Sequence, residues 1–237
     1  MKSAPPSSLL PLQSSTARLF VVATPIGNLE DITLRALRVL READLIAAED
    51  TRRTAQLLNH FQIRKPLVSY HQFNEAKRTA ELIEQLATGS RIALVTDAGS
   101  PTISDPGGRL IRACIERGIA VEVVPGASAV IAALTVSGFG GDEFVFAGFL
   151  PTKSGRRREA QERIAAETRA VVIYESPYRL LKTLGELRAI CPERQIVVVR
   201  ELTKKFEEVL RGTAGEILQK FEGRNVKGEV TLVISPM

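Results

Sequence analysis

The stretch VTDAGSPTISDPGG, residues 95–108, follows a short apolar run and precedes a segment with helical period. It contains two aspartates, three glycines and two prolines, and no lysine or arginine. A strand that leads through a glycine-rich loop into a helix is the repeating unit of a parallel sheet, and such sheets bind ligands at the carboxyl ends of their strands. The stretch therefore predicts an α/β fold with a binding site beside this loop.

The same alternation of apolar runs and helical periods extends to both sides of this loop. Strands are predicted at 19–24, 44–49, 66–70, 91–96 and 120–124, and helices at 32–43, from about 52, and at 75–87, 108–118 and 125–138. After the glycine-rich residues 138–144 the strands follow one another with less helix between them. These strands are predicted at 144–148, 170–175, 196–202, 207–212 and 229–235, with helices at 156–168, 178–190 and 213–221. The pattern predicts an α/β protein of two domains, with a mostly parallel sheet in the N-terminal one and a mixed sheet in the C-terminal one.

The domain organisation follows from these changes in composition. We expect residues 1–18, rich in serine and proline, to form a disordered leader. The N-terminal domain is predicted to span residues 19–140 and to carry the binding loops, and the C-terminal domain to span 141–237. No apolar run reaches the length of a membrane span, so a soluble, cytoplasmic protein with no membrane association is expected.

Charge and cysteine usage narrow the class of protein. The chain has 32 Lys and Arg against 27 Asp and Glu, which gives a formal net charge of +5. This excess is compatible with an anionic partner such as nucleic acid, although many basic proteins bind none. The two cysteines are far apart, and there are only two histidines. These counts argue against a disulfide framework or a structural zinc site, and no metal is expected.

Three predicted strand-to-helix loops are rich in Gly, Pro, Ser and Thr: residues 24–31, 96–108 and 125–129. None contains GxxxxGK[ST], and the first lacks the GxGxxG of a dinucleotide site, which argues against a nucleotide phosphate as the main ligand. An acidic, glycine-rich loop suits a small zwitterionic molecule with a cationic centre. Asp97, at the end of a strand, is predicted to face that ligand. Asp105 precedes a proline and is predicted to cap the next helix.

Eight motifs, in order along the chain, resemble those of a known family. They are VVATPIGNLEDIT, EDTRRT, VTDAGSPTISDPG, VPGASA, FLPTKSGRR, YESPYRL, RELTKKFEE and KGEVTLVI. Together they resemble the bacterial methyltransferases that modify the ribose 2′-hydroxyl of a cytidine in small-subunit ribosomal RNA, within the tetrapyrrole methylase-like, class III fold. The resemblance extends from about residue 19 to residue 235. It implies two α/β domains, S-adenosylmethionine (SAM) in the cleft between them, and a homodimer.

The resemblance also implies which residues bind the cofactor. They come from the loop after the first strand, from the loop quoted at the start, from the PGASA turn and from the crossing between the domains. The implied residues are Pro25, Ile26, Gly27, Asp97, Ala98, Gly99, Ser100, Ser128, Ala129 and Leu150.

The chain departs from the family pattern in two respects. The pattern carries histidine where this chain has Tyr178 and Phe206, so no catalytic histidine is expected at either position. Many members continue after the last strand into a basic helical tail, and we expect the RNA contacts of such a tail to be absent or replaced here.

Methyl transfer to a ribose hydroxyl needs the acceptor oxygen in line with the methyl group, and it benefits from a neighbour that removes or polarises the hydroxyl proton. Candidate catalytic residues are Glu49, Asp50, Arg52, Lys153 and Glu175, with Tyr174 beside the last of them. Each has a structural alternative. Glu49 and Asp50 could cap the helix that follows, and Glu175 could be an ordinary carboxylate at a proline turn.

An RNA substrate would need a basic rim around the cleft. Candidate phosphate contacts are Arg53, Arg156, Arg157 and Arg158, next to Arg52 and Lys153. The run KSGRRR could instead be a solvated start of a helix, but basic residues there oppose the helix dipole and so favour a phosphate-binding role.

The sequence thus predicts a SAM-dependent enzyme that methylates the ribose 2′-hydroxyl of a cytidine in the decoding region of small-subunit rRNA. Its partner is predicted to be that rRNA or the assembled small ribosomal subunit. One alternative is a methyltransferase of the same fold acting on a small, tetrapyrrole-like molecule, which the basic segments disfavour. Another is a non-catalytic RNA-binding module, which the acidic loops disfavour.

Overall fold

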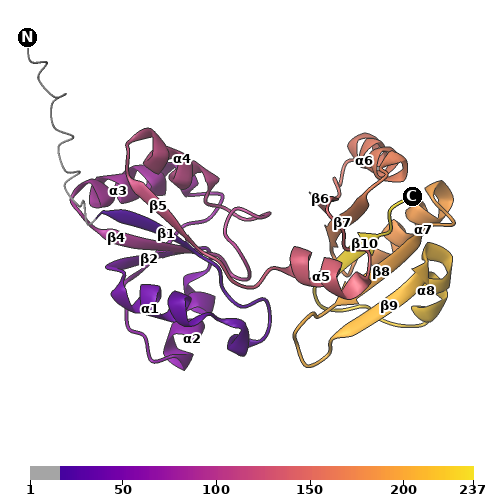
Figure 1. Ribbon diagram of the computed structural model, residues 1–237, viewed down its shortest axis with the longest axis horizontal. Helices are drawn as coiled ribbons and strands as arrows, with labels where there is room; N and C mark the ends of the chain where they lie inside the picture. The colour runs from indigo at the N-terminus through magenta and orange to yellow at the C-terminus, as the bar shows by residue number, and fades with distance from the viewer. Residues whose placement is uncertain (1–16) are drawn as a thin grey trace, which may run out of the picture.

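The computed structural model describes residues 17–237 and shows two halves, each built around its own sheet (Figure 1). The first sheet has the strand order β3-β2-β4-β1-β5, and every neighbouring pair is parallel. Its strands are β1 (Arg18–Val22), β2 (Leu45–Ala48), β3 (Leu67–Ser69), β4 (Arg91–Val95) and β5 (Ala120–Val124). Because all of them run the same way, the loops that follow them open at one edge of the sheet.

Helices cover both faces of this sheet, which explains why its strands are almost wholly apolar. Along β1, Phe20 and Val22 pack with α1 (Leu34–Glu42) and α2 (Thr51–His60). Leu19 and Val21 point the other way and pack with α3 (Glu75–Ala87) and α4 (Gly108–Glu116). The side chains alternate between the two faces as the period of a strand requires.

The second sheet is mixed, with the order β6-β7-β10-β8-β9. Its strands are β6 (Phe144–Phe149), β7 (Ala170–Glu175), β8 (Gln195–Arg200), β9 (Glu208–Thr213) and β10 (Val230–Ile234). The β6–β7 pair is parallel and the other pairs are antiparallel. One face packs with α6 (Ser154–Ala166), α7 (Leu180–Ile190) and α8 (Ala214–Lys220). The predicted fold class, α/β with a parallel first sheet and a mixed second one, is confirmed.

The helix α5 (Ala129–Ser137) covers the other face of the second sheet. Its Val130, Ala133 and Leu134 pack with valines of β7, β8 and β10. Although α5 lies before the boundary expected at residue 140, its packing belongs to the second half, with which it lies in Figure 1. We therefore propose that the two domains divide at residues 125–128, between β5 and α5.

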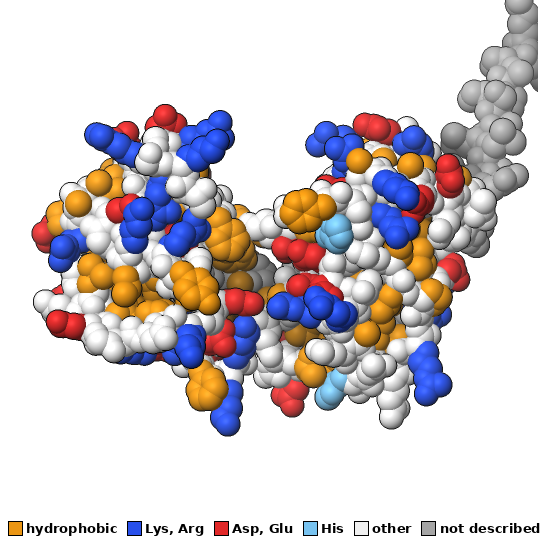
Figure 2. Space-filling view, turned by 180° about the vertical axis from the view of Figure 1, so that it is seen from behind, with side chains coloured by type: hydrophobic (Ala, Val, Ile, Leu, Met, Phe, Trp, Pro, Cys, Tyr) orange, Lys and Arg blue, Asp and Glu red, His pale blue; other side chains and the backbone are white. Residues whose placement is uncertain are grey.

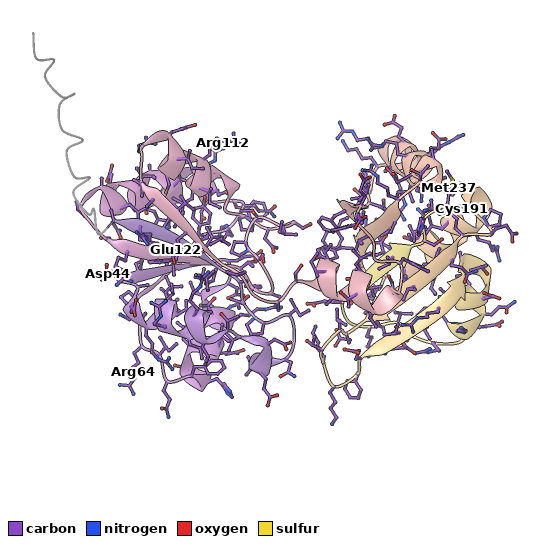
Figure 3. The ribbon with its side chains drawn as sticks, in the orientation of Figure 1. Asp44, Arg64, Arg112, Glu122, Cys191 and Met237 are labelled. Carbon is purple, nitrogen blue, oxygen red and sulfur yellow. The ribbon has the colours of Figure 1, made fainter. Side chains whose placement is uncertain are left out.

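Other sequence-based expectations concern the start of the chain and the cysteines. The predicted leader lies outside the described residues up to residue 16, whereas Ala17 is buried and Arg18 opens β1. Cys191 is labelled in the second half in Figure 3 and Cys114 lies on α4 of the first half, so the two buried thiols are free and well separated. Within residues 17–237, no helix has both the length and the apolar content to cross a membrane.

Candidate functional site

The loops after β1 and β4 are joined to each other at the open edge of the first sheet. Thr24 and Gly99 exchange two backbone hydrogen bonds, of 2.9 and 3.1 Å, and the Thr24 hydroxyl donates to the carbonyl of Thr96 at 3.1 Å. Gly99 has a φ of +80°, a conformation that glycine adopts without strain. The loop after β5 joins them, because Gly126 lies so close to Ala23 that a Cβ there would come within 3.0 Å of the alanine side chain. The three predicted loops therefore meet.

A cavity of about 420 Å³ lies between this edge and the second half of the molecule. The first half contributes Ile26, Glu49, Arg53, Asp97, Ala98, Gly99, Ser100, Ile103, Ser104 and Asp105. The α5 start and the second sheet contribute Ser128, Ala129, Phe149, Tyr174, Glu175, Ser176, Pro177, Val199, Leu202, Gly228, Glu229, Val230 and Thr231. Figure 2 shows acidic, basic and apolar side chains on both sides of the gap between the two halves.

Most of the residues implied as cofactor-binding lie on the cavity wall. They are Ile26, Asp97, Ala98, Gly99, Ser100, Ser128 and Ala129. Pro25 and Gly27 line an adjoining hollow that shares Ile26, Asp97 and Ala98 with the cavity. Leu150 does not line the cavity, because its side chain is 2% exposed and packs in the core of the second half.

Three carboxylates form one side of the cavity. Glu49 Oε2 accepts a hydrogen bond of 2.6 Å from the Thr96 hydroxyl and one of 3.3 Å from the backbone N–H of Asp97. Asp97 Oδ1 accepts from the backbone N–H of Asp50 at 3.1 Å, and its Oδ2 is 3.4 Å from Arg53 Nη1. Burial, and then repulsion from Glu49, raises the pKa of Asp97. The cavity therefore carries concentrated negative charge on its first-half wall.

Asp105 is the third carboxylate, and its place corrects the prediction that it caps a helix. The helix α4 begins at Gly108, as predicted, with Gly107 as its N-cap residue, so Asp105 lies two residues before the cap position. Asp105 lines the cavity instead, where burial and then the charge of Glu49 raise its pKa to about 6. The helix start predicted at residue 108 was the signal in the sequence, since Asp105 lies too far before it to be the N-cap.

In the EDTRRT segment, residues 49–54, Glu49 and Arg53 line the cavity, whereas Asp50 and Arg52 do not. Asp50 is the N-cap of α2 and accepts a hydrogen bond of 2.8 Å from the backbone N–H of Arg52. It therefore caps the helix, which was the structural alternative to a catalytic role. The Arg52 guanidinium folds back onto the same carboxylate at 2.7 Å and lowers the pKa of Asp50. Glu49 and Arg53 are the members of the segment that face the cavity.

Glu175 and Arg157 belong to one buried network. The Glu175 carboxylate is shielded from solvent and accepts from Arg179 at 2.6 Å and from the Thr183 hydroxyl at 2.6 Å. Arg157 is 4% exposed and lies 3.6 Å from Glu175 and 2.8 Å from Glu186. These contacts fasten α6 and α7 to the end of β7, so neither side chain is available to a substrate. Lys153, Arg156 and Arg158 are exposed and lie outside the cavity.

The second-half wall holds residues that the motifs did not single out as binding residues. Phe149 lies against Tyr174, with ring centres 5.5 Å apart, and burial raises the pKa of Tyr174 to about 12, so the phenol keeps its proton. Leu202, Glu229 and Thr231 come from the ends of strands in the mixed sheet. Residues at strand ends follow the ordinary alternation of a strand, and no residue type there marks a binding site. Sequence reasoning therefore missed these three residues.

The loops that border the cavity are strained. Thr102 and Ser104 in the first half, and Glu201 and Thr203 in the second, have φ between +51° and +75° without being glycine. Such conformations cost free energy and cluster at functional sites. Glu201 and Thr203 belong to the hairpin of residues 201–207, between β8 and β9, whose Lys204 side chain lies against Gly27 of the first half. The hairpin thus closes one side of the cavity.

A parallel sheet whose loops face a second, mixed sheet across a cavity defines the class of two-domain α/β proteins to which known methylases belong. The sequence model of the tetrapyrrole (corrin/porphyrin) methylases matches residues 18–218, and a solved structure, the uroporphyrin-III C-methyltransferase of Thermus thermophilus complexed with S-adenosylhomocysteine, has the same fold. Its TM-score is 0.64 at 19% identity, covering 92% of this chain and 97% of that one.

The sequence comparisons are more specific. The ribosomal RNA small subunit methyltransferase I of Thermotoga maritima is 49% identical over 218 residues, covering 92% of this chain and 98% of that protein. The protein of the same name from Synechocystis is 51% identical over 218 residues, covering 92% of this chain and 78% of that protein. The chain belongs to the tetrapyrrole methylase family and, within it, to the ribosomal RNA small subunit methyltransferase I group.

Proposed function

We propose that the protein transfers a methyl group from SAM to the ribose 2′-hydroxyl of a cytidine in the decoding region of small-subunit rRNA. Membership of this family supports the coarser part, a SAM-dependent enzyme that methylates small-subunit rRNA. The observation that carries the proposal is the cavity, in which the loops after β1, β4 and β5 of such a chain face the second half.

The cavity suits SAM in size and chemistry. About 420 Å³ is within the range of small-molecule sites. The backbone groups of residues 98–100 and the hydroxyls of Ser100 and Ser128 offer donors and acceptors on the wall. Asp97 and Glu49 offer negative charge to a cationic molecule. When bound, SAM would supply a methyl group on a positively charged sulfur. We propose Pro25, Ile26, Gly27, Asp97, Ala98, Gly99, Ser100, Ser128 and Ala129 as the residues that hold it.

Asp105 is the carboxylate best placed to accept the proton of the hydroxyl. Glu49 accepts two hydrogen bonds, from the Thr96 hydroxyl and the Asp97 amide, whereas Asp105 has a side-chain hydrogen bond with Thr96 alone. Glu175 is buried in its network. Asp105 lies on the first-half wall, close enough to Tyr174 of the second half for its charge to raise the pKa of that phenol. Its raised pKa, about 6, makes it a stronger base than an ordinary aspartate while leaving it largely ionised at neutral pH. We therefore propose Asp105 as the general base, in place of the candidates from the sequence.

Exposed cations around the cavity would contact the RNA backbone. Arg53 lines the cavity with 63% of its side chain exposed, and Arg156, Arg158 and Lys153 lie on the surface at the start of α6. Replacing Arg156 and Arg158 together with alanine should weaken RNA binding. It should also lower the salt dependence of binding by roughly one logarithmic unit for each phosphate that is no longer neutralised. Filter binding across a salt titration measures this. Unchanged salt dependence would make these residues an ordinary solvated helix start.

We also propose that the protein works as a cytoplasmic homodimer on the rRNA or the assembled subunit. The strand β5 is an open edge of the first sheet, and Val123 on it is 65% exposed beside Leu34, which is 86% exposed. Arg35, which follows Leu34 on α1, donates to the Val123 carbonyl and so joins the start of α1 to this edge strand. An exposed apolar surface of this kind is typical of subunit contacts.

The proposed reaction is tested with rRNA from cells that lack this protein. Naked small-subunit rRNA and assembled small subunits are incubated with the protein and SAM, and ribose methylation is mapped by resistance to alkaline hydrolysis. The expected result is one protected cytidine. Methylation on a base, or transfer to a tetrapyrrole with none to RNA, would contradict the proposal.

A further inference from the structure

Four aromatic side chains are exposed in residues 17–237: Phe73 by 86%, Phe149 by 54%, Tyr178 by 94% and Phe206 by 66%. The chain has nine Phe, three Tyr and no Trp, so a third of its aromatic rings stand in solvent. A single exposed aromatic residue needs no explanation, but a group of them around one feature does. Phe149 lines the cavity and Phe73 a hollow that shares residues with it, whereas Tyr178 and Phe206 lie in segments that also contribute wall residues.

Two of these rings belong to the second-half wall. Phe149 lines the cavity itself and lies against Tyr174. Tyr178 follows Ser176 and Pro177, both of which line the cavity. Tyr178 is almost fully exposed and directly follows these two wall residues in the chain.

Phe73 stands on the first-half side. It lines a hollow that shares Glu49, Ser104 and Asp105 with the cavity. Its ring is held edge-on by His71, with ring centres 5.9 Å apart, and its backbone N–H donates to the same imidazole at 3.2 Å. The ring is therefore exposed although its backbone is fixed.

Phe206 stands on the hairpin of residues 201–207, next to the Lys204 that lies against Gly27. Lys205 Nζ is 5.6 Å from the centre of the Phe206 ring. On the first-half side, the side chains of Arg52 and Arg53 are 87% and 63% exposed, and Arg53 lines the cavity. The hollow beside Phe73 itself is lined by Glu49, Glu75 and Asp105. Figure 2 shows rings and basic side chains on both sides of the gap.

Exposed rings interleaved with cations are the pattern by which proteins bind unpaired nucleic acid, because every base has a flat face that stacks on an aromatic ring. We propose that Phe73, Tyr178 and Phe206, the rim rings, stack on unpaired bases that flank the methylated nucleotide. The substrate segment is then single-stranded or looped RNA with its bases turned outward, not a duplex. This inference rests on the proposed function and specifies the form of its RNA substrate.

The nearby positive charge favours RNA over a second copy of the chain as the occupant of these rings. The apolar side chains proposed for the dimer, Leu34 on α1 and Val123 on the edge strand β5, do not line the cavity. The rim rings are therefore expected to remain uncovered in a dimer.

The test replaces each rim ring with leucine, which keeps an apolar side chain but removes the flat face. Phe73→Leu, Tyr178→Leu and Phe206→Leu are compared with Tyr178→Phe, which keeps the ring. Ile115→Ala is the matched control, since Ile115 is 65% exposed on α4 and lies outside the cavity. Binding to an unstructured oligoribonucleotide and to a duplex of the same sequence is measured by fluorescence anisotropy. A 2-aminopurine base in the oligonucleotide reports stacking directly.

Each leucine substitution should weaken binding of the unpaired oligonucleotide by roughly tenfold, within the range of base–aromatic stacking, and reduce the change in 2-aminopurine fluorescence. Tyr178→Phe and Ile115→Ala should bind as the wild type does, and SAM affinity should be unchanged throughout. Three results would overturn the proposal. The leucine variants could bind the unpaired oligonucleotide as tightly as the wild type, or they could lose as much affinity for the duplex as for the unpaired strand. The substitutions could also dissociate a dimer in a sedimentation experiment. If the wild type methylates rRNA and the leucine variants bind RNA as it does, the stacking role of the rim rings is refuted but the proposed function is not. A wild type that methylates no RNA refutes the proposed function.

Discussion

The two walls of the cavity are made from different parts of the chain's chemistry. The first-half wall combines three carboxylates with backbone loops, which are held by the exchange between Thr24 and Gly99 and by the close approach of Gly126 to Ala23. The second-half wall is made of side chains such as Phe149 and Tyr174, at the ends of strands fixed by a buried ionic network. Backbone loops need particular residue types at particular positions, whereas a side-chain wall tolerates many. Sequence motifs therefore predict the first wall, whereas the second wall depends on how distant segments of the chain pack together.

The largest effect is expected from disrupting the buried ionic network that supports the second-half wall. Glu175→Ala leaves Arg157 buried without one of its carboxylate partners, and removing one member of a buried ion pair costs about 3 to 5 kcal/mol. Urea unfolding followed by circular dichroism measures the free energy of unfolding. The control Glu162→Ala breaks an exposed pair with Arg158 and should cost about 0.5 kcal/mol or less. Equal stability of the two variants would mean that the network is not what supports this wall.

The next effect concerns Asp105, on the first wall. Asp105→Asn removes the proposed base and should lower kcat at least about 100-fold, the lower range for general base catalysis. In the wild type, kcat should rise with pH through about 6, where Asp105 loses its proton, and the variant should lack this rise.

Stability distinguishes this role from a structural one. The folded pKa of Asp105, about 6, is above its ordinary value of 3.8, so between about pH 4 and 6 the folded protein binds the proton more tightly than the unfolded chain. This carboxyl therefore makes folding less favourable as pH rises through that window. Asp105→Asn should remove that dependence and be no less stable than the wild type above pH 6. A variant that unfolds more readily at pH 7 would indicate a structural role.

How far the sequence predicted the molecule depended on whether a feature was local. Strand and helix positions agreed closely, because apolar runs and helical periods are local. The partner of α5 could not be predicted, because a helix that is apolar nearly all round marks no single face for packing. Arg157 and Glu175 are 18 positions apart in the sequence, and their pairing arises only when α6 packs beside β7. Asp105 was misjudged because the Asp-Pro pair suggested a cap two residues before Gly107, which is the N-cap in the structure.

A moderate effect is expected for the acidic part of the first wall. Asp97→Ala removes a carboxylate that lines the cavity and should weaken SAM binding by about 1 to 3 kcal/mol, as expected when a charged hydrogen-bond partner is removed. Isothermal titration calorimetry measures the affinity. Asp142→Ala is the matched control, since Asp142 is exposed and lies outside the cavity. If both variants bind SAM as the wild type does, Asp97 is not a cofactor ligand.

The smallest effect tests the place where the two walls touch. A Cβ at Gly27 would collide with the Lys204 side chain and come within 2.9 Å of the Thr203 hydroxyl, so Gly27→Ala should push the 201–207 hairpin away from the first half. Because a lysine side chain can move, we expect the free energy of unfolding to fall by about 1 kcal/mol, at the low end of overpacking costs. Lys204→Ala should relieve part of this strain, and the double-mutant cycle should show a coupling of about 0.5 kcal/mol or more. Gly140→Ala is the control, because a Cβ there meets nothing within 4 Å.

Additive effects in the cycle would mean that the two walls stay in place without this contact, and that the hairpin does not close the cavity. Coupling in unfolding together with weaker SAM binding would show that the side-chain wall holds the backbone wall at the distance the cofactor needs.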